Sequence, residues 1–193
     1  MKIVITSFLP FGSSNTNSSF EVVKRVKANE TIELKKVTLD VIYDPNIFID
    51  IIDKEKPDIL LLCGQAQGRK EVCIEQIGIN LMHSSIPDNL GVIKNYEKIY
   101  DNNIDGIFST IPTSTLVNSL SNYPVKLSLS AGSFICNLSL YVSLLHCKFN
   151  KLKTLVGFIH YPLYTGQIKE EPNSLDLDIM VEITNNIIDL LAK

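Results

Sequence analysis

The chain has 193 residues, of which 45% are hydrophobic and 20% are charged, a composition typical of a globular protein with one sizeable core. Its 18 basic and 21 acidic side chains give a net charge of -3, which argues against nucleic acid or an anionic membrane as the main partner. The apolar runs fall well short of the ~20 residues that cross a bilayer, and no signal-peptide pattern opens the chain. We therefore expect a cytoplasmic protein with a single domain over residues 1–193, whose ligand is a small uncharged molecule or a peptide.

Short segments rich in Val, Ile and Leu alternate with segments of helical periodicity, which predicts an α/β fold. In chain order, strands are expected at 2–8, 32–41, 58–63, 125–130 and 153–160, and helices at 19–28, 45–54, 114–120, 133–148 and 175–192. The polar run 12–19 and the segment 83–105 are expected to be loops. Ligands of open α/β sheets bind beyond the carboxyl ends of the strands, so the segments that follow strands are the first place to look for a site.

Cys136 lies in such a segment, at the start of the helix expected over 133–148. With Ser133 as the N-cap, it falls in the first turn, where free N–H groups and the helix dipole lower the pKa of a thiol and favour a nucleophile. The alternative is an ordinary buried cysteine, which is the role we expect for Cys63, Cys73 and Cys147. The spacing of the four cysteines contains no CxxC pair, so neither a zinc site nor a redox motif is predicted.

A cysteine nucleophile needs a base, and histidine is the usual one near neutral pH. His160 ends the strand expected over 153–160 and should emerge at the functional edge of the sheet, whereas His83 and His146 fit surface or capping positions. The period-two pattern of residues 73–81 puts Glu75 on the same strand face as apolar side chains. Its carboxylate therefore either reaches water at a strand end or pairs with a cation or an imidazole N–H. The second option would complete a Cys–His–carboxylate triad.

Two more segments follow predicted strands. The run GQAQGR at 64–69 lacks the glycine and lysine spacing of a phosphate loop, so a nucleotide site is not predicted. Phe8, Pro10 and Phe11 form a rigid aromatic corner, which either packs in the core or makes one wall of an apolar pocket.

Taken together, these segments resemble the pyroglutamyl peptidase I family, also called pyrrolidone carboxyl peptidases, which are cysteine peptidases that remove N-terminal pyroglutamate. The resemblance covers about residues 3 to 168. The family motifs GFxPFG, GQAGGR, ERVAIN, IPDN, FSTLP, AGTFVCN and GFIH occur here in order as SFLPFG at 7–12, GQAQGR at 64–69, EQIGIN at 75–80, IPDN at 86–89, FSTIP at 108–112, AGSFICN at 131–137 and GFIH at 157–160, followed by Pro162 and Gln167.

The resemblance implies a three-layer α/β/α fold with a mixed sheet, and a homo-oligomer, either a dimer or a tetramer. It also implies that Cys136 is the nucleophile, His160 the general base and acid, and Glu75 the residue that orients His160. Such a mechanism requires no metal or cofactor. For a pyroglutamyl peptide we expect the lactam ring to be bound by Phe8, Phe11 and Gln65, which line the expected pocket.

One departure from the family pattern affects the expected site. The family has DAR before IPDN, whereas this chain has His83, Ser84 and Ser85, so a serine replaces an arginine expected near the active site. Arg69 is present, but the sequence does not show that it substitutes. Two alternatives to a pyroglutamyl peptidase therefore stay open: a thiol amidase for another cyclic or N-acyl substrate, and a non-catalytic binding homologue.

Overall fold

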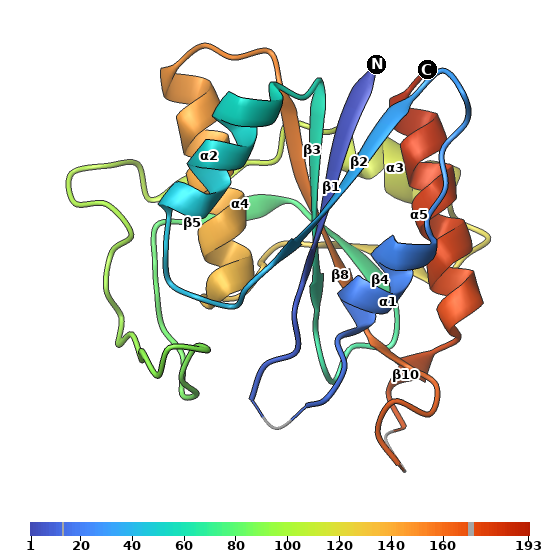
Figure 1. The fold of residues 1–193 in the computed structure, drawn as a ribbon, viewed down its shortest axis with the longest axis horizontal. Helices are drawn as coiled ribbons and strands as arrows, with labels where there is room; N and C mark the ends of the chain where they lie inside the picture. The colour runs from blue at the N-terminus through green and yellow to red at the C-terminus, as the bar shows by residue number, and fades with distance from the viewer. Residues whose placement is uncertain (13, 170–171) are drawn as a thin grey trace.

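A six-stranded sheet in the order β2-β1-β3-β8-β4-β7 forms the centre of the computed structural model, which describes residues 1–12, 14–169 and 172–193 (Figure 1). All neighbouring strands run parallel except β4 and β8, which are antiparallel. The sheet is therefore mixed, as predicted. Its strands are β1 (Lys2–Phe8), β2 (Glu33–Leu39), β3 (Ile59–Gln65), β4 (Val72–Glu75), β7 (Val125–Ser128) and β8 (Leu155–Tyr161).

Helices cover both faces of this sheet, which confirms the three-layer α/β/α architecture (Figure 1). One face carries α1 (Ser18–Arg25), α3 (Thr113–Ser119) and α5 (Leu177–Leu191), and the other carries α2 (Asn46–Glu55) and α4 (Ile135–Phe149). No helix in the described part of the chain is long and apolar enough to cross a membrane.

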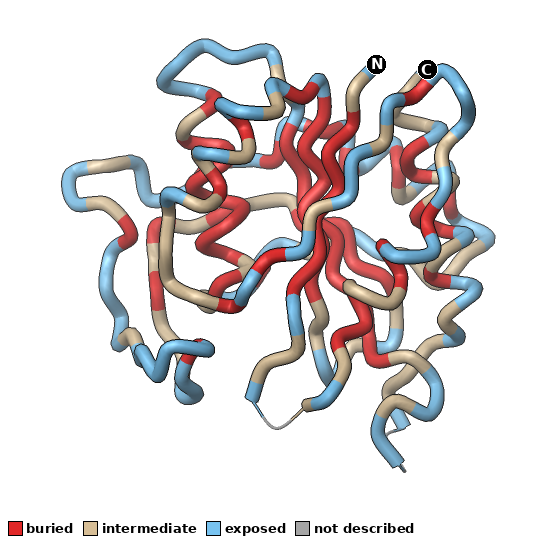
Figure 2. The backbone as a smooth tube through the Cα atoms, in the orientation of Figure 1, coloured by how far each residue is buried: buried red, intermediate tan, exposed pale blue. Residues whose placement is uncertain are grey.

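The core has two halves because successive side chains of a strand point to opposite faces of the sheet. Leu60 and Leu62 of β3 belong to the cluster under α2 and α4, whereas Ile59 and Leu61 belong to the cluster under α1, α3 and α5. Figure 2 shows the buried residues concentrated in the central strands and along the helices that face them. Strands buried on both faces explain the continuous apolar runs seen in the sequence.

The expected strands and helices form, with ends that shift by up to three residues. The alternating segment 73–81 is the exception, because it splits into β4 and β5 (Ile77–Ile79), and β5 pairs with β6 (Gly106–Phe108) in a separate two-stranded sheet. A third small sheet pairs β9 (Leu163–Tyr164) with β10 (Ser174–Leu175). Strands of two or three residues are too short for periodicity to reveal them.

The segment between β5 and β6 is mostly irregular, as predicted, and the IPDN motif attaches it to the rest of the fold. The carboxylate of Asp88 accepts hydrogen bonds from the backbone N–H groups of Tyr43, Leu90 and Val92, at 2.8 to 2.9 Å. The backbone N–H of Asn89 donates to the carbonyl of Val41 at 2.8 Å. The motif thus joins this segment to the loop between β2 and α2.

Candidate active site

A cavity of about 250 Å³ lies where the carboxyl ends of β1, β3 and β8 meet the start of α4. It brings together Cys136, His160, Phe8, Phe11 and Gln65, all of which the sequence singled out. The remaining lining residues are Asn17, Val41, Ala66, Arg69, Ala131, Gly132, Ser133, Phe134 and Ile135. The volume is below the range of about 300 to 1,000 Å³ typical of sites for drug-sized ligands, so the cavity suits a small group.

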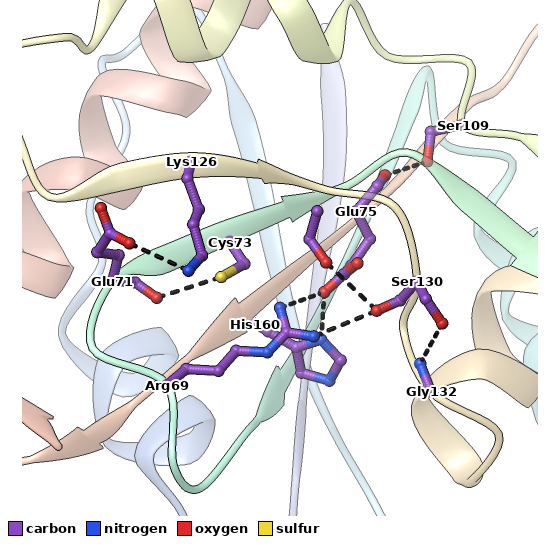
Figure 3. A network of polar contacts seen from close by, with 10 residues as sticks. Arg69, Glu71, Cys73, Glu75, Ser109, Lys126, Ser130, Gly132 and His160 are labelled. Carbon is purple, nitrogen blue, oxygen red and sulfur yellow. Dashed lines mark hydrogen bonds and ion pairs between the residues drawn. The ribbon is translucent and has the colours of Figure 1, made fainter.

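Glu75 lies next to this cavity and is hydrogen-bonded to His160 (Figure 3). The antiparallel register of β4 and β8 places Cys73 opposite His160 and Glu75 opposite Phe158. Glu75 and His160 are therefore diagonal neighbours on one face of the sheet, within reach of each other's long side chains. Glu75 Oε1 lies 2.7 Å from His160 Nδ1, and both side chains are buried. Of the two options left open for Glu75, the paired one is correct.

The charges in this pair follow from burial and from the neighbours. Burial lowers the pKa of His160, although the hydrogen bond to Glu75 works in the opposite direction. Burial also disfavours the ionised form of Glu75, but the hydrogen bond from His160 and the charges around it outweigh this effect and lower the pKa of the carboxyl. Near neutral pH the pair is thus a carboxylate and a neutral imidazole. The imidazole donates its Nδ1 proton to Glu75, which leaves Nε2 as a proton acceptor.

Cys136 is the second residue of α4, so it lies in the first turn as predicted, but the expected cap is wrong. The N-cap is Phe134, which makes no side-chain capping bond. The hydroxyl of Ser133 instead donates to the carbonyl of His83 at 2.8 Å, and the N–H of His83 donates to the carbonyl of Ser133 at 2.9 Å. Ser133 therefore attaches the segment before the helix to the segment that carries the IPDN motif.

The thiol of Cys136 packs against the bare backbone of Gly64 in β3. A Cβ atom at Gly64 would lie 2.8 Å from Cys136 Sγ and 2.8 Å from Phe158 Cζ, closer than such atoms approach. Gly64 is also the register partner of His160 on the neighbouring strand. Because Gly64 has no side chain, the thiol of Cys136 fits against β3 at the position that pairs with His160 of β8.

The predicted low pKa of Cys136 is wrong. Burial raises the pKa of the thiol to about 12, and the nearby negative charge of Glu75 adds to this effect, whereas the charge of Arg69 works against it. A helix start favours a thiolate, but here the loss of hydration and the carboxylate outweigh that contribution. The resting site therefore holds a neutral thiol and a neutral imidazole.

Aromatic rings form one wall of the cavity. Phe8 is almost fully buried, with 2% of its surface exposed, and Phe11 packs against Phe134 with ring centroids 6.2 Å apart. Tyr43 contacts Phe134 edge-on at 5.4 Å. Phe8 and Phe11 both line the cavity, which is one of the two positions that the sequence left open for them. Phe134 was missed, although it belongs to the AGSFICN motif that was quoted for Cys136.

Gln65 is held in one orientation at the end of β3. Its Oε1 accepts hydrogen bonds from the backbone N–H of Ser18 at 2.8 Å and from Nε2 of Gln167 at 2.7 Å. Gln167 is fixed in turn, because its Oε1 accepts a hydrogen bond from the N–H of Tyr164 at 3.1 Å. These contacts leave the amide nitrogen of Gln65 as the group that a ligand in the cavity can use.

Arg69 and Ser85 lie in different places relative to the cavity, a difference that the sequence did not show. Arg69 lines the cavity, and its Nη1 lies 2.6 Å from Glu75 Oε1. Ser85 is exposed and is not among the residues that line the cavity. The positive charge beside Glu75 therefore comes from the 64–69 segment.

The other histidines and cysteines lie outside the cavity lining. His146 Nε2 lies 2.8 Å from Asp53 Oδ1 on the surface of α4, and the ring of His83 stacks on Tyr96 with centroids 3.8 Å apart. As predicted, the remaining cysteines, Cys63, Cys73 and Cys147, are buried. Within residues 1–12, 14–169 and 172–193, no group of three or more His, Cys, Asp and Glu side chains could hold a metal ion.

Comparison with known proteins adds to this geometry. The family model described as pyroglutamyl peptidase matches residues 1–192. The chain belongs to the pyroglutamyl peptidase family. Membership of this family makes it a hydrolase of the cysteine peptidase class.

Relatives within the pyroglutamyl peptidase family match over their whole length. The pyrrolidone-carboxylate peptidase of Thermoanaerobacter sp. (strain X514) is 36% identical over 200 residues, which cover 100% of this chain and 98% of that protein. The one from Thermococcus onnurineus (strain NA1) is 34% identical, with 100% of both chains covered. Among solved structures, a mutant pyrrolidone carboxyl peptidase from Pyrococcus furiosus superposes with a TM-score of 0.94 at 27% identity, covering 100% of this chain and 98% of that one.

Proposed function

We propose that this chain hydrolyses the amide bond after an N-terminal pyroglutamate, with Cys136 as nucleophile, His160 as general base and acid, and Glu75 as the residue that orients His160. The observation that carries the proposal is that Cys136 and His160 line one small cavity while Glu75 is hydrogen-bonded to the far nitrogen of His160. The names of the family and of the relatives above supply the substrate class.

The first half-reaction transfers the acyl group to the enzyme. Cys136 Sγ bonds to the carbonyl carbon of the pyroglutamyl residue while its proton passes to Nε2 of His160. The negative charge that develops on the carbonyl oxygen is stabilised by backbone N–H groups at the start of α4, which have no carbonyl partner within the helix. The carbon–nitrogen bond then breaks, and His160 returns the proton to the departing amine.

The second half-reaction restores the enzyme. Water gives a proton to His160 as its oxygen attacks the thioester. The carbon–sulfur bond then breaks to release pyroglutamate, and His160 returns the proton to the sulfur, which restores the Cys136 thiol. Glu75 stabilises the imidazolium that forms in each half-reaction. A neutral thiol and a neutral imidazole at rest fit this scheme, because the proton leaves sulfur only as the substrate is attacked.

The cavity lining supports selection of an uncharged lactam. Phe8 and Phe11 offer apolar surface to the five-membered ring. The amide nitrogen of Gln65 donates to the lactam carbonyl, because its amide oxygen already accepts two hydrogen bonds. Proline has the same ring size but lacks this carbonyl. A site that hydrogen-bonds a substrate group rejects the analogue without that group far more strongly than a size difference allows.

Release of a fluorescent amine from pyroglutamyl, prolyl and N-acetylated amides tests the proposal and its alternatives. We expect turnover of the pyroglutamyl amide, background rates for Cys136→Ala, and a kcat lowered on the order of 10³- to 10⁴-fold for Glu75→Gln. Cys147→Ala, which removes a buried cysteine outside the cavity, is the matched control. Turnover of an N-acetylated amide alone would favour the thiol amidase. Absence of turnover for all three amides would favour the non-catalytic homologue.

A further inference from the structure

The carboxylate of Glu75 has a second donor besides His160, and this donor also reaches the loop before the nucleophile. Arg69 Nη1 lies 2.6 Å from Glu75 Oε1, the same oxygen that His160 contacts. Arg69 Nη2 donates to the backbone carbonyl of Ser130 at 3.2 Å. Figure 3 shows the guanidinium beside Glu75, His160 and Ser130. One side chain thus joins the buried acid to the segment that leads into α4 and Cys136.

We propose that Arg69 is a positioning residue, which holds Glu75 and the loop at Ser130 in a fixed relation so that His160 and Cys136 meet in reactive geometry. The inference rests on the function proposed above and extends it to a residue for which the sequence suggested no role. Arg69 acts through Glu75 and Ser130, not by contact with the reacting atoms.

Burial makes such a partner necessary. The side chain of Glu75 is fully buried, and an isolated carboxylate in that environment is costly unless it is paired. A neutral imidazole supplies a hydrogen bond but no positive charge. Arg69 supplies the charge, and its side chain is itself only 24% exposed, which limits screening by solvent. In the resting site the positive charge of Arg69 and the negative charge of Glu75 therefore cancel.

Arg69 is also the only lysine or arginine among the described residues that line the cavity. The nearest other cation along its own loop, Lys70, is exposed. At position 85 the family motif has an arginine, whereas this chain has Ser85, which is exposed and does not line the cavity. A fixed positive charge at the site therefore depends on Arg69.

The ionisable groups around His160 come from three parts of the fold. Glu75 and Cys73 lie on β4, Arg69 on the loop before it, and Cys136 on α4. Glu71 and Lys126, which lie further along, are paired with each other at 3.1 Å. Burial lowers the pKa of His160, Glu75 raises it, and the charge of Arg69 makes a further, smaller contribution that lowers it. Arg69 thus makes the imidazolium a better proton donor to the leaving amine.

Three variants separate positioning from other roles. We expect Arg69→Gln to lower kcat about 10- to 100-fold, as when a group that orients a ligand of a metal site is removed, with less than a threefold change in KM. Arg69→Lys should recover part of kcat, because an ammonium keeps the charge but lacks the planar fork that bridges two acceptors. Lys70→Gln, which removes a charge from the same loop, should match the wild-type protein.

The pH dependence gives a readout that a purely structural role would not change. Without the opposing charge of Arg69, His160 binds its proton more readily, so the acid limb of kcat/KM should move to higher pH in Arg69→Gln and stay in place in Arg69→Lys. An NMR titration of the imidazole signals measures the same shift without any substrate. His160→Gln identifies the signal, and His146 serves as the internal control.

Several outcomes would overturn the role of Arg69. The first is a folded Arg69→Gln variant with wild-type kcat and an unshifted His160 titration. The second is an Arg69→Gln variant in which only KM changes. The third is a loss of kcat in Lys70→Gln equal to that in Arg69→Gln. If Arg69→Gln does not fold, wild-type kcat in Arg69→Lys would overturn it. If the wild-type protein does not cleave pyroglutamyl amides, the proposed function fails, and the His160 titration in Arg69→Gln still decides whether Arg69 controls the imidazole.

Discussion

Cys136 Sγ lies where a side chain at position 64 would be, so the candidate nucleophile packs against the backbone of Gly64 in β3. An added Cβ at position 64 would meet Cys136 Sγ and Phe158 Cζ, each at 2.8 Å. The position of the sulfur therefore requires that residue 64 of β3 has no side chain.

Substitution of Gly64 by alanine should displace the thiol. We expect Gly64→Ala to lower kcat by about 10²-fold, the loss that a misplacement of about 1 Å can cause, and to destabilise the fold by about 1 to 3 kcal/mol through overpacking. Gly106→Ala is the matched control, because its Cβ would come closest to the flexible end of Ile77, at 3.3 Å, and would meet backbone only at the ordinary contact distance of 3.7 Å from Gly78 O. Amide turnover and urea unfolding measure both effects. Equal kcat values for the two variants would contradict the assigned contact.

Activity should persist into mildly acidic conditions. A free histidine has a pKa of about 6.5, and burial lowers the pKa of His160 below this value. A base with a lowered pKa stays unprotonated to lower pH, so the acid limb of kcat/KM should be centred below pH 6.5. A profile of kcat/KM between pH 4.5 and 8 reports this group in the free enzyme. An acid limb centred above pH 7 would show that the imidazole is not held in its neutral form.

Removal of the Asp88 charge should loosen the cavity rim. Asp88→Asn keeps the shape of the side chain but replaces one acceptor oxygen with a donor that faces backbone N–H groups. Hydrogen bonds to a charged group contribute about 1.5 to 3 kcal/mol, so the free energy of unfolding should fall by about that amount. KM should also rise, because the motif holds the loop that carries Val41 in the cavity wall. Asp101→Asn, at an exposed position, should change neither quantity.

Gln167 should affect substrate binding without touching the nucleophile. In Gln167→Glu the donor to Gln65 Oε1 is replaced by a second acceptor, so the amide of Gln65 loses its fixed orientation. We expect KM for the pyroglutamyl amide to rise by about tenfold, since about 1.4 kcal/mol of hydrogen bonding is lost, while kcat changes little. The alanine variant should show a smaller rise. A KM unchanged in both variants would rule out a role of Gln65 in binding the lactam.

The sequence predicted most of the fold and the identity of the candidate triad. Cys136 and His160 were recognisable because each follows or ends a strand, and residues at the ends of neighbouring strands meet at one edge of the sheet. The family motifs pointed to the same residues. The homo-oligomer, the cytoplasmic location and the single domain stay predictions.

What the sequence could not predict depends on register and burial. The contact of Glu75 with His160 needs the antiparallel pairing of β4 with β8, and no local pattern reports which strands become neighbours. The pKa of Cys136 is a balance between a helix start, which the sequence shows, and the loss of water around the thiol, which it does not. The cap at Phe134 was missed because Ser133 forms a tertiary hydrogen bond in place of the local one.

The position of β8 also bears on how the enzyme matures. This strand is the last of the six in the chain, yet it lies between β3 and β4 and joins two parts of the sheet that otherwise do not touch. Those two parts therefore form one sheet only once residues 155–161 are present and paired with both of them. The same strand carries His160. A chain that stops before residue 155 thus holds Cys136 without His160 and, on the proposed mechanism, has a thiol without a base.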